Sequence, residues 1–332
     1  MATRLLVLYT GGTIGMDHTP AGLAPVPGLL PKLLDRFRRD DLTIDVVEYP
    51  ELIDSSAITV AHWNRLIDDI ATNYAAYDGF VVIHGTDTMA YTASVLAFAL
   101  HGLNKPVVLT GSQLPLVHPR SDGWSNLADA LEAAAQPSLC EVVLAFNRQL
   151  LRGVTARKLD AASFAGFESP NAEPLAEFGI DVAWYRDRWC QPRGEFAPVR
   201  LDESAEVLLF MLAPGATAAQ IGRTLAERKP AGAVLLSYGN GNAPADPALL
   251  DGVRVASAAG SLILNLTQVV HGRVAVGAYA ASQPLAQAGA LPGADMTPEA
   301  AIAKLTVLAS QRLELALARA LLEKSLVGEF ND

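Results

Sequence analysis

The sequence predicts an α/β protein with a larger N-terminal domain built on a mostly parallel sheet and a smaller C-terminal α/β domain. Three observations predict this class. Short apolar runs rich in β-branched residues recur without polar alternation, so both faces of each strand should be buried. Stretches with helical periodicity lie between these runs. A charged segment with two prolines and no clear period, residues 184–203, interrupts the alternation.

The first half of the chain alternates between the two kinds of segment. Strands are expected at 4–9, 44–49, 80–85, 106–111 and 141–146, and helices at 60–75, 89–103 and 123–136. This order is typical of a doubly wound domain. We therefore place an N-terminal catalytic domain at 1–185 and a linker at 186–204.

The C-terminal domain, residues 205–332, continues the pattern. Strands are expected at 205–212, 232–239 and 260–268. One last helix is expected over 296–324, where Thr297 can cap the helix, Pro298 suits its first turn, and Glu299 interacts favourably with its dipole.

Composition limits the possible partners and compartment. The chain has 332 residues and a formal net charge of −10, which argues against nucleic acid as the main partner. Cys140 and Cys190 fit no metal-ligand spacing and suggest a reducing compartment. We find no signal peptide and no apolar run long enough to cross a membrane, so a cytoplasmic protein is expected.

Polar motifs follow the predicted strands at their carboxyl ends, where open α/β sheets bind ligands. The motifs read TGGTIG, HGTDTM and TGSQLP in the first domain, and SYGNGN and NLTQ in the second. They gather hydroxyl, carboxylate and amide groups beside glycines. No metal-ligand cluster occurs among them, so no metal is expected.

The motif TGGTIG allows three interpretations. It can be a strand-to-helix turn that needs small residues. It can be a dinucleotide loop, although Thr10 replaces the first glycine of that fingerprint, with Glu48 as the ribose-binding acid. It can also present Thr13 as a nucleophile that a substrate carbonyl approaches closely because the neighbouring residues are glycines.

The motif HGTDTM places a second hydroxyl, Thr86, beside the carboxylate of Asp87. A threonine alcohol needs a base, and a lysine with a lowered pKa would serve. We expect Thr88 to cap the following helix and His84 to be a structural residue at the end of its strand.

TGGTIGM and HGTDTMAYTAS resemble the two threonine motifs of the bacterial L-asparaginase family, and the intracellular type I branch is the more similar. The resemblance extends over nearly the whole chain. It includes ELIDSS at 51–56, RSDGWSNL at 120–127, FESPN at 167–171, GNGNAP at 239–244 and GADMT at 293–297. It implies a flavodoxin-like N-terminal domain, active sites at the contact of two subunits, and a homodimer or homotetramer.

The resemblance also implies a role for each matching residue. Thr13 is the nucleophile that forms a β-aspartyl enzyme, and the second triad is Thr86, Asp87 and Lys158. The implied substrate-binding residues are Ser55, Ser56, Asp87 and Asn242, of which Asn242 approaches from a neighbouring subunit. The implied reaction converts L-asparagine and water to L-aspartate and ammonia, without a cofactor.

Several alternatives remain open at this stage. Without the motif match, Lys158 beside Arg157 would be a solvated lysine, and the two serines would belong to a loop or a helix cap. Other functions are an amidohydrolase acting on glutamine or D-asparagine, an amidotransferase subunit, an amino-acid sensor with weakened catalysis, and a dinucleotide-dependent oxidoreductase. The amidotransferase subunit is disfavoured because such subunits usually carry an extra N-terminal domain, whereas the first motif here begins at residue 10.

One departure from the family pattern concerns catalysis. Leu23 occupies the position of a family tyrosine that hydrogen-bonds the nucleophile. Leucine can neither relay a proton nor orient a hydroxyl, so another tyrosine, or His18 from the same loop, would have to replace it, or the enzyme would be slow.

Overall fold

A computed structural model describes residues 2–20, 22–192, 194–274 and 283–331. The chain forms two compact units, Met1–Pro198 and Val199–Asp332. The boundary lies within the segment expected as a linker. The first part of that segment packs with unit 1, where Trp189 is buried and its ring meets Trp184 edge to face.

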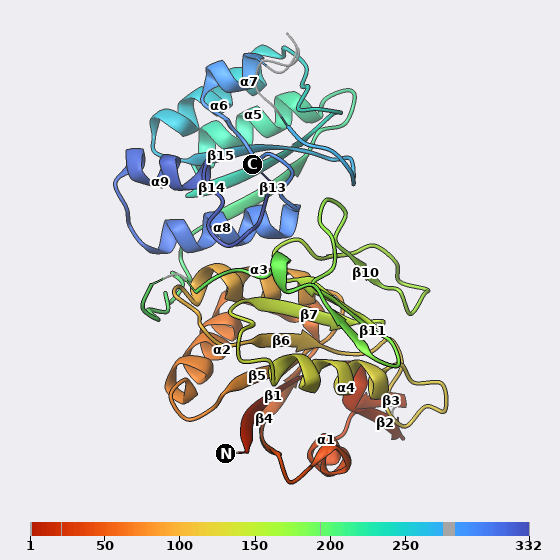
Figure 1. Ribbon diagram of the computed structural model, residues 1–332. Coiled ribbons are helices and arrows are strands. Elements are labelled where there is room, and N and C mark those ends of the chain that lie inside the picture. The colour runs from red at the N-terminus through yellow and green to blue at the C-terminus, as the bar shows by residue number, and fades with distance from the viewer. Residues whose placement is uncertain (1, 21, 193, 275–282, 332) are drawn as a thin grey trace. The chain divides into compact units, whose positions relative to one another are not determined.

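Unit 1 is built on an eight-stranded sheet with the order β12-β11-β8-β7-β6-β5-β1-β4 (Figure 1). The five strands from β4 to β7 are parallel, and they match the five strands expected from the sequence. The antiparallel extension by β8, β11 and β12 was not expected. The sheet strands are β1 (Thr3–Gly11), β4 (Leu42–Ile53), β5 (Gly79–Ile83), β6 (Val107–Thr110), β7 (Val142–Phe146), β8 (Gln149–Arg152), β11 (Ala176–Phe178) and β12 (Val182–Trp184).

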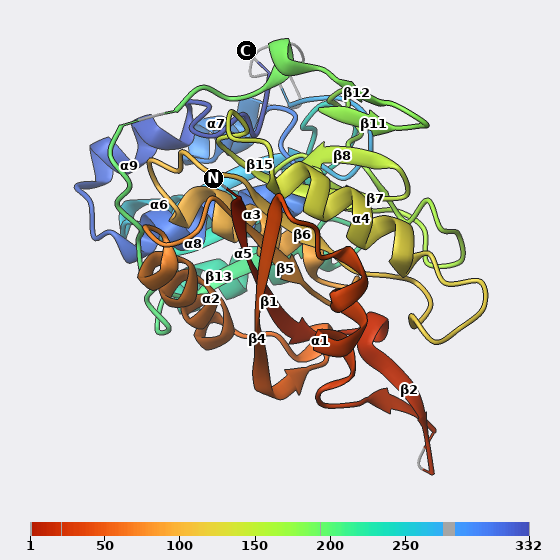
Figure 2. The same ribbon diagram turned by 60° about the horizontal axis from the view of Figure 1, so that its bottom comes forward.

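Helices cover both faces of this sheet because its central strands are apolar on both sides (Figure 2). Helices α2 (Val60–Asn73) and α3 (Met89–Ala99) lie on one face, and α1 (Leu29–Leu34) and α4 (Gly123–Ala134) lie on the other. Two short antiparallel ladders complete unit 1: β2 (Met16–Thr19) with β3 (Gly22–Pro25), and β9 (Arg157–Lys158) with β10 (Phe167–Glu168).

Unit 2 repeats the layered plan on a smaller sheet with the order β13-β14-β15-β16, which is parallel throughout. One core cluster joins the sheet to α5 and α6, and another joins it to α8 and α9. The predicted α/β class of both domains is thus confirmed. The elements are β13 (Val207–Met211), α5 (Thr217–Arg228), β14 (Gly232–Ser237), α6 (Pro247–Ala258), β15 (Leu262–Thr267), α7 (Gln283–Ala288), β16 (Leu291–Pro292), α8 (Pro298–Ser310) and α9 (Leu315–Leu322).

The single last helix expected over 296–324 is wrong, because the chain breaks into α8 and α9. Thr297 does cap α8, since its hydroxyl accepts from the Ala300 N–H. The break falls at residues 311–314, where Arg312 adopts a left-handed conformation with φ of 50°. It lets α9 fold back so that Leu322 joins Leu305 in one core.

A buried ion pair joins Lys304 of α8 to Glu329 in the segment that follows α9. Lys304 Nζ lies 2.7 Å from Glu329 Oε1, and both side chains are fully buried. The ammonium also donates to the carbonyls of Leu322 and Lys324, and the carboxylate accepts from the Leu326 and Val327 N–H groups. Each charge is therefore neutralised and hydrogen-bonded, which a buried charge requires.

We predict that Lys304→Met destabilises unit 2 by roughly 3–5 kcal/mol, because Glu329 would remain as an uncompensated buried charge. Urea unfolding followed by circular dichroism, with hydrogen exchange of the α9 amides, measures the change. The control is Arg254→Met, which breaks a surface ion pair with Asp251 in the same unit and should cost less than about 1 kcal/mol. Equal losses in the two variants would contradict the prediction.

Candidate active site

Four predicted motifs follow four strands that are neighbours in the sheet, in the order β4, β1, β5, β6. Ser55 follows β4, Thr13 follows β1, Thr86 follows β5 and Gln113 follows β6. The strands are parallel, and Tyr9 of β1 pairs with Ile83 of β5, so their carboxyl ends share one edge. The sheet therefore delivers all four motifs to one place, as expected for an open α/β domain.

Glycines let the first two motifs touch through their backbones. Gly11 and Gly12 adopt positive φ values of 135° and 93°. A Cβ atom on Gly12 would lie 2.6 Å from the backbone nitrogen of Gly85, closer than such atoms approach in proteins. Thr13 comes directly after this contact, at the start of a short 3-10 helix. Its half-buried hydroxyl has no hydrogen-bond partner among the described residues.

Ser55 belongs to the same cluster, and Ser56 does not. Ser55 is buried, and a Cβ atom on Gly85 would lie 2.5 Å from its Oγ. Ser56 is exposed, and its N–H donates to the Asp54 carboxylate. The cap expected from Thr88 is wrong, because its hydroxyl donates to the Ser55 carbonyl at 2.8 Å and so ties the β5 loop to the β4 loop.

Lys158 joins the second threonine to its neighbouring carboxylate. Its Nζ donates to Thr86 Oγ1 at 2.8 Å and to Asp87 Oδ1 at 2.7 Å. The pairing of Lys158 with Phe167 in the β9–β10 ladder fixes the backbone from which this side chain extends. The side chain is only 18% exposed, so the alternative of a solvated lysine is wrong.

Gln113 also contacts the second threonine, although no role was predicted for it from the sequence. The Thr86 hydroxyl reaches its Oε1 at 3.5 Å, and its Nε2 donates to the Ser163 carbonyl at 3.0 Å. Its backbone N–H donates to the Asp122 carboxylate. The position of TGSQLP at the end of β6 was the available signal, but it does not distinguish Gln113 from its neighbours.

His84 is the first residue of the motif HGTDTM, and it has the structural role expected of it. It is 2% exposed and hydrogen-bonds the Gly85 carbonyl through Nδ1 and the Thr92 hydroxyl through Nε2. Burial lowers the pKa of its imidazole to about 4, which the hydrogen bond to Gly85 only partly opposes. The ring is therefore neutral at physiological pH.

Two further residues singled out by the sequence are Leu23 in unit 1 and Asn242 in unit 2. Leu23 is 51% exposed on the β2–β3 hairpin, opposite His18, which is also exposed. Asn242 belongs to unit 2, where its backbone pairs with Tyr238 in a tight turn. Its buried Oδ1 has no hydrogen-bond partner in the described part of the chain.

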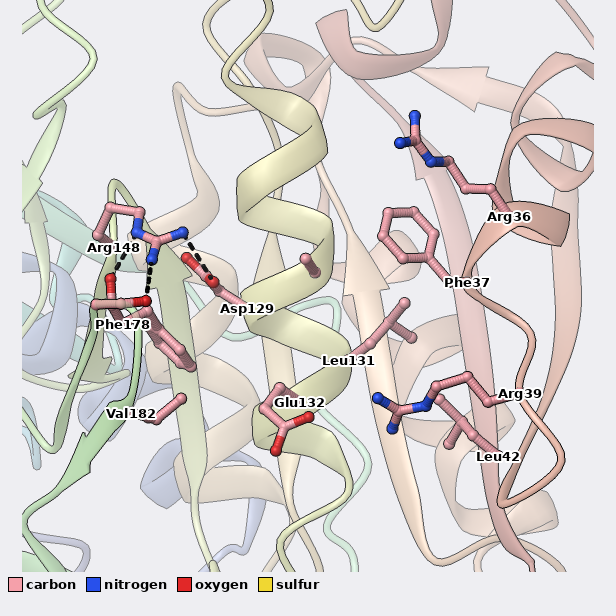
Figure 3. Close-up of a pocket in the computed structure, with 12 residues that line it drawn as sticks. Arg36, Phe37, Arg39, Leu42, Asp129, Leu131, Glu132, Arg148, Phe178 and Val182 are labelled. Carbon is pink, nitrogen blue, oxygen red and sulfur yellow. Dashed lines mark hydrogen bonds and ion pairs between the residues drawn. The ribbon is translucent and has the colours of Figure 1, made fainter.

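Unit 1 also contains a hollow of about 400 Å³, and no residue of the threonine motifs is among those that line it (Figure 3). Arg36, Arg39, Asp129, Glu132 and Arg148 contribute its charged groups. Burial raises the pKa of Asp129 to about 6, and Arg148, 3.6 Å away, opposes the rise. Within the described residues, no group of three side chains could hold a metal ion.

Comparison with known proteins shows the family. Residues 4–190 match the profile described as asparaginase, N-terminal, and residues 206–322 match that of the glutaminase/asparaginase C-terminal domain. The chain therefore belongs to the asparaginase family, as the threonine motifs predicted.

Individual relatives support the type I branch. L-asparaginase 1 of Escherichia coli K12 is 42% identical over 334 residues, covering 98% of this chain and 97% of that protein. L-asparaginase I of Vibrio cholerae matches both chains over their full length with 42% identity and a TM-score of 0.90. The human 60 kDa lysophospholipase is 41% identical over 98% of this chain, which spans 61% of that protein.

We predict that His84 makes the protein sensitive to mild acid. The unfolded chain binds a proton at this ring below pH 6.5, whereas the folded protein does so only near pH 4. The free energy of unfolding should therefore fall by up to about 3 kcal/mol from this residue as the pH drops from 6.5 to 4. Urea unfolding at several pH values, followed by tryptophan fluorescence, measures the free energy of unfolding of unit 1.

The comparison variant is His84→Asn, which has no group that titrates in this range. Carboxylates elsewhere titrate equally in both proteins, so the difference between the two pH curves isolates the histidine. Curves that run parallel from pH 7 to pH 4 would contradict the prediction.

Proposed function

We propose that this protein hydrolyses the side-chain amide of L-asparagine, giving L-aspartate and ammonia through a threonine acyl-enzyme. One observation carries the proposal. Lys158 contacts both Thr86 and Asp87 at the sheet edge where the backbone of the Thr13 turn packs against Gly85. Two alcohols on loops whose backbones touch, with an amine and a carboxylate at the second, are groups that acyl transfer needs. The relatives from Escherichia coli and Vibrio cholerae carry the name L-asparaginase.

In the first half of the reaction, Thr13 Oγ1 attacks the carboxamide carbon. A tetrahedral oxyanion forms, and the C–N bond then breaks as the proton lost by the Thr13 hydroxyl passes to the departing amide nitrogen, which leaves as ammonia. The free hydroxyl of Thr13 suits this role, because no described group has to release it before it meets a substrate. The product of this half is an ester between Thr13 and the β-carboxyl group of aspartate.

In the second half, Thr86 and Lys158 activate the water that attacks this ester. The Lys158 amine lies 2.8 Å from the Thr86 hydroxyl, within reach for proton transfer. Breakdown of the second tetrahedral intermediate returns the proton to Thr13 and frees aspartate.

The same edge offers groups for the two charged ends of an amino acid. Asp87 is 64% exposed and uses Oδ1 for Lys158, which leaves Oδ2 to accept from a substrate ammonium. Ser55 supplies a buried hydroxyl for the α-carboxylate, and Ser56 lies beside it at the surface. Asn242 would come from a neighbouring subunit, so the proposal includes a homodimer or homotetramer.

The proposal also covers the setting of the enzyme. It needs no cofactor and no metal, and its partner is a small amino-acid amide rather than nucleic acid, in keeping with the net charge of −10. No helix in the described ranges is long and apolar enough to cross a membrane. We place the protein in the cytoplasm, like the intracellular branch that its motifs resemble.

Ammonia release from L-asparagine, L-glutamine and D-asparagine tests the function. We expect L-asparagine to be the best substrate, with L-glutamine slower by about 10- to 200-fold in kcat/KM, since one methylene contributes only ~1–3 kcal/mol of discrimination. Lys158→Met should lower kcat/KM for L-asparagine by ~10²–10⁴ through loss of the base. Lys32→Met, at an exposed lysine of α1, is the matched control. Absence of ammonia from all three amides, or equal activity in the two lysine variants, would refute the proposal.

Leu23 favours a second possibility, an enzyme whose catalysis is weakened. The structure leaves this side chain exposed on the hairpin that follows the nucleophile, without a hydroxyl to orient Thr13. We predict that Leu23→Tyr raises kcat on L-asparagine by at least about tenfold, because a general-base contact typically contributes 10²–10⁴. Leu23→Phe, which adds the ring without the hydroxyl, should produce no gain. Equal rates for the two variants would show that the hydroxyl is not what this position lacks.

A further inference from the structure

A buried chain of hydrogen bonds ends at the carbonyl oxygen of the peptide that joins Gly85 to Thr86. The Trp63 indole on α2 donates to Thr92 Oγ1 on α3 at 2.9 Å. That hydroxyl lies 3.0 Å from His84 Nε2, and His84 Nδ1 lies 2.7 Å from the Gly85 carbonyl oxygen. Thr92 is completely buried and His84 nearly so.

The donor and acceptor chemistry of these groups determines which atom carries each hydrogen in the chain. An indole only donates and a carbonyl only accepts. Thr92 therefore accepts from Trp63 and keeps its own hydrogen for the ring of His84. Nδ1 must carry the hydrogen that reaches the Gly85 carbonyl, and a neutral ring then presents Nε2 as the acceptor for Thr92. One tautomer satisfies all four groups, and the lowered pKa of His84 keeps the ring in the neutral form.

Holding the Gly85 carbonyl also sets the direction of the Thr86 N–H. In a planar trans peptide the carbonyl and the N–H point in opposite directions. The N–H of Thr86 therefore points away from the His84 ring. It has no hydrogen-bond partner among the described residues, so it remains free to donate.

The neighbouring residues leave this peptide little freedom to rotate. Gly85 packs against Gly12 on one side and Ser55 on another, at the junction of the three motif loops. The Thr86 side chain is 8% exposed and held by Lys158. A rotation of the peptide would break the hydrogen bond to His84 and disturb the packing of Gly85 against Gly12 and Ser55.

We propose that His84 is a positioning residue: its Nδ1–H holds the Gly85 carbonyl so that the Thr86 N–H is presented to the oxyanion formed from the substrate carboxamide, with Thr92 and Trp63 holding the ring in place. This inference rests on the proposed amide hydrolysis. Removing one oxyanion donor typically lowers kcat by 10²–10³, because the interaction exists mainly in the transition state.

Steady-state kinetics on L-asparagine separates positioning from support of the fold. We expect His84→Leu to lower kcat by ~10²–10³ with a change in KM of less than about threefold. His84→Asn keeps a short amide donor near the Gly85 carbonyl and should recover at least about tenfold of that loss. Thr92→Val removes the support of Nε2 and should lower kcat by about tenfold.

The matched control for Thr92→Val is Thr306→Val, another buried threonine, whose hydroxyl donates only to the Ile302 carbonyl of its own helix in unit 2. It should leave kcat and KM unchanged. Unchanged kcat in His84→Leu, or a loss that His84→Asn does not relieve, would overturn the positioning role. If His84→Leu does not fold, Thr92→Val decides, and it overturns the role if its kcat equals that of Thr306→Val.

Nitrogen NMR of the wild-type protein gives a readout that is independent of activity. We expect a neutral His84 ring at pH 7 with the proton on Nδ1, and loss of that signature only near pH 4. A proton on Nε2 at pH 7 would overturn the inference. Absence of ammonia release by the wild type would instead remove the proposed function, while the NMR signature would still establish which group His84 holds.

Discussion

The backbone contact between Gly12 and Gly85 is the constraint on which this site depends. β1 and β5 are paired in parallel up to Tyr9 and Ile83, and the loops that follow converge until Gly85 leaves no room for a Cβ atom on Gly12. Two side chains that lie 73 residues apart in the sequence, Thr13 and Thr86, are thereby attached to one compact piece of backbone. Glycine is required because a side chain would separate the two loops.

A second constraint is electrostatic and comes from outside the parallel sheet. Lys158 lies on a two-residue strand beyond β8, and its ammonium joins the hydroxyl of Thr86 to the carboxylate of Asp87. The bonds to a charged group are stronger than neutral ones and orient both partners. The antiparallel part of unit 1 therefore contributes to the chemistry by bringing one amine to the parallel edge.

Much of the fold and part of the site could be predicted from the sequence. The parallel strands were visible because burial on both faces produces continuous apolar runs, and the motifs at their ends follow from topology. The roles of Lys158 and Ser55 needed the family resemblance, since their contacts are long-range. Gln113 was missed for the same reason. The break between α8 and α9 was missed because helical periodicity continues through residues 311–314, and the buried Lys304 that draws α9 back is not recognisable from local pattern.

The two threonines differ in how completely their surroundings are formed before a substrate arrives. Thr86 is buried, its hydroxyl meets Lys158 and Gln113, and the carbonyl of the peptide before it is held by His84. The hydroxyl of Thr13 has no such partner in the part of the chain that the structure describes. In the proposed reaction, the groups that activate water for the second half are already in place. The first half instead depends on the bound substrate to complete the surroundings of the nucleophile, and that is the half in which the hydroxyl missing from Leu23 would act.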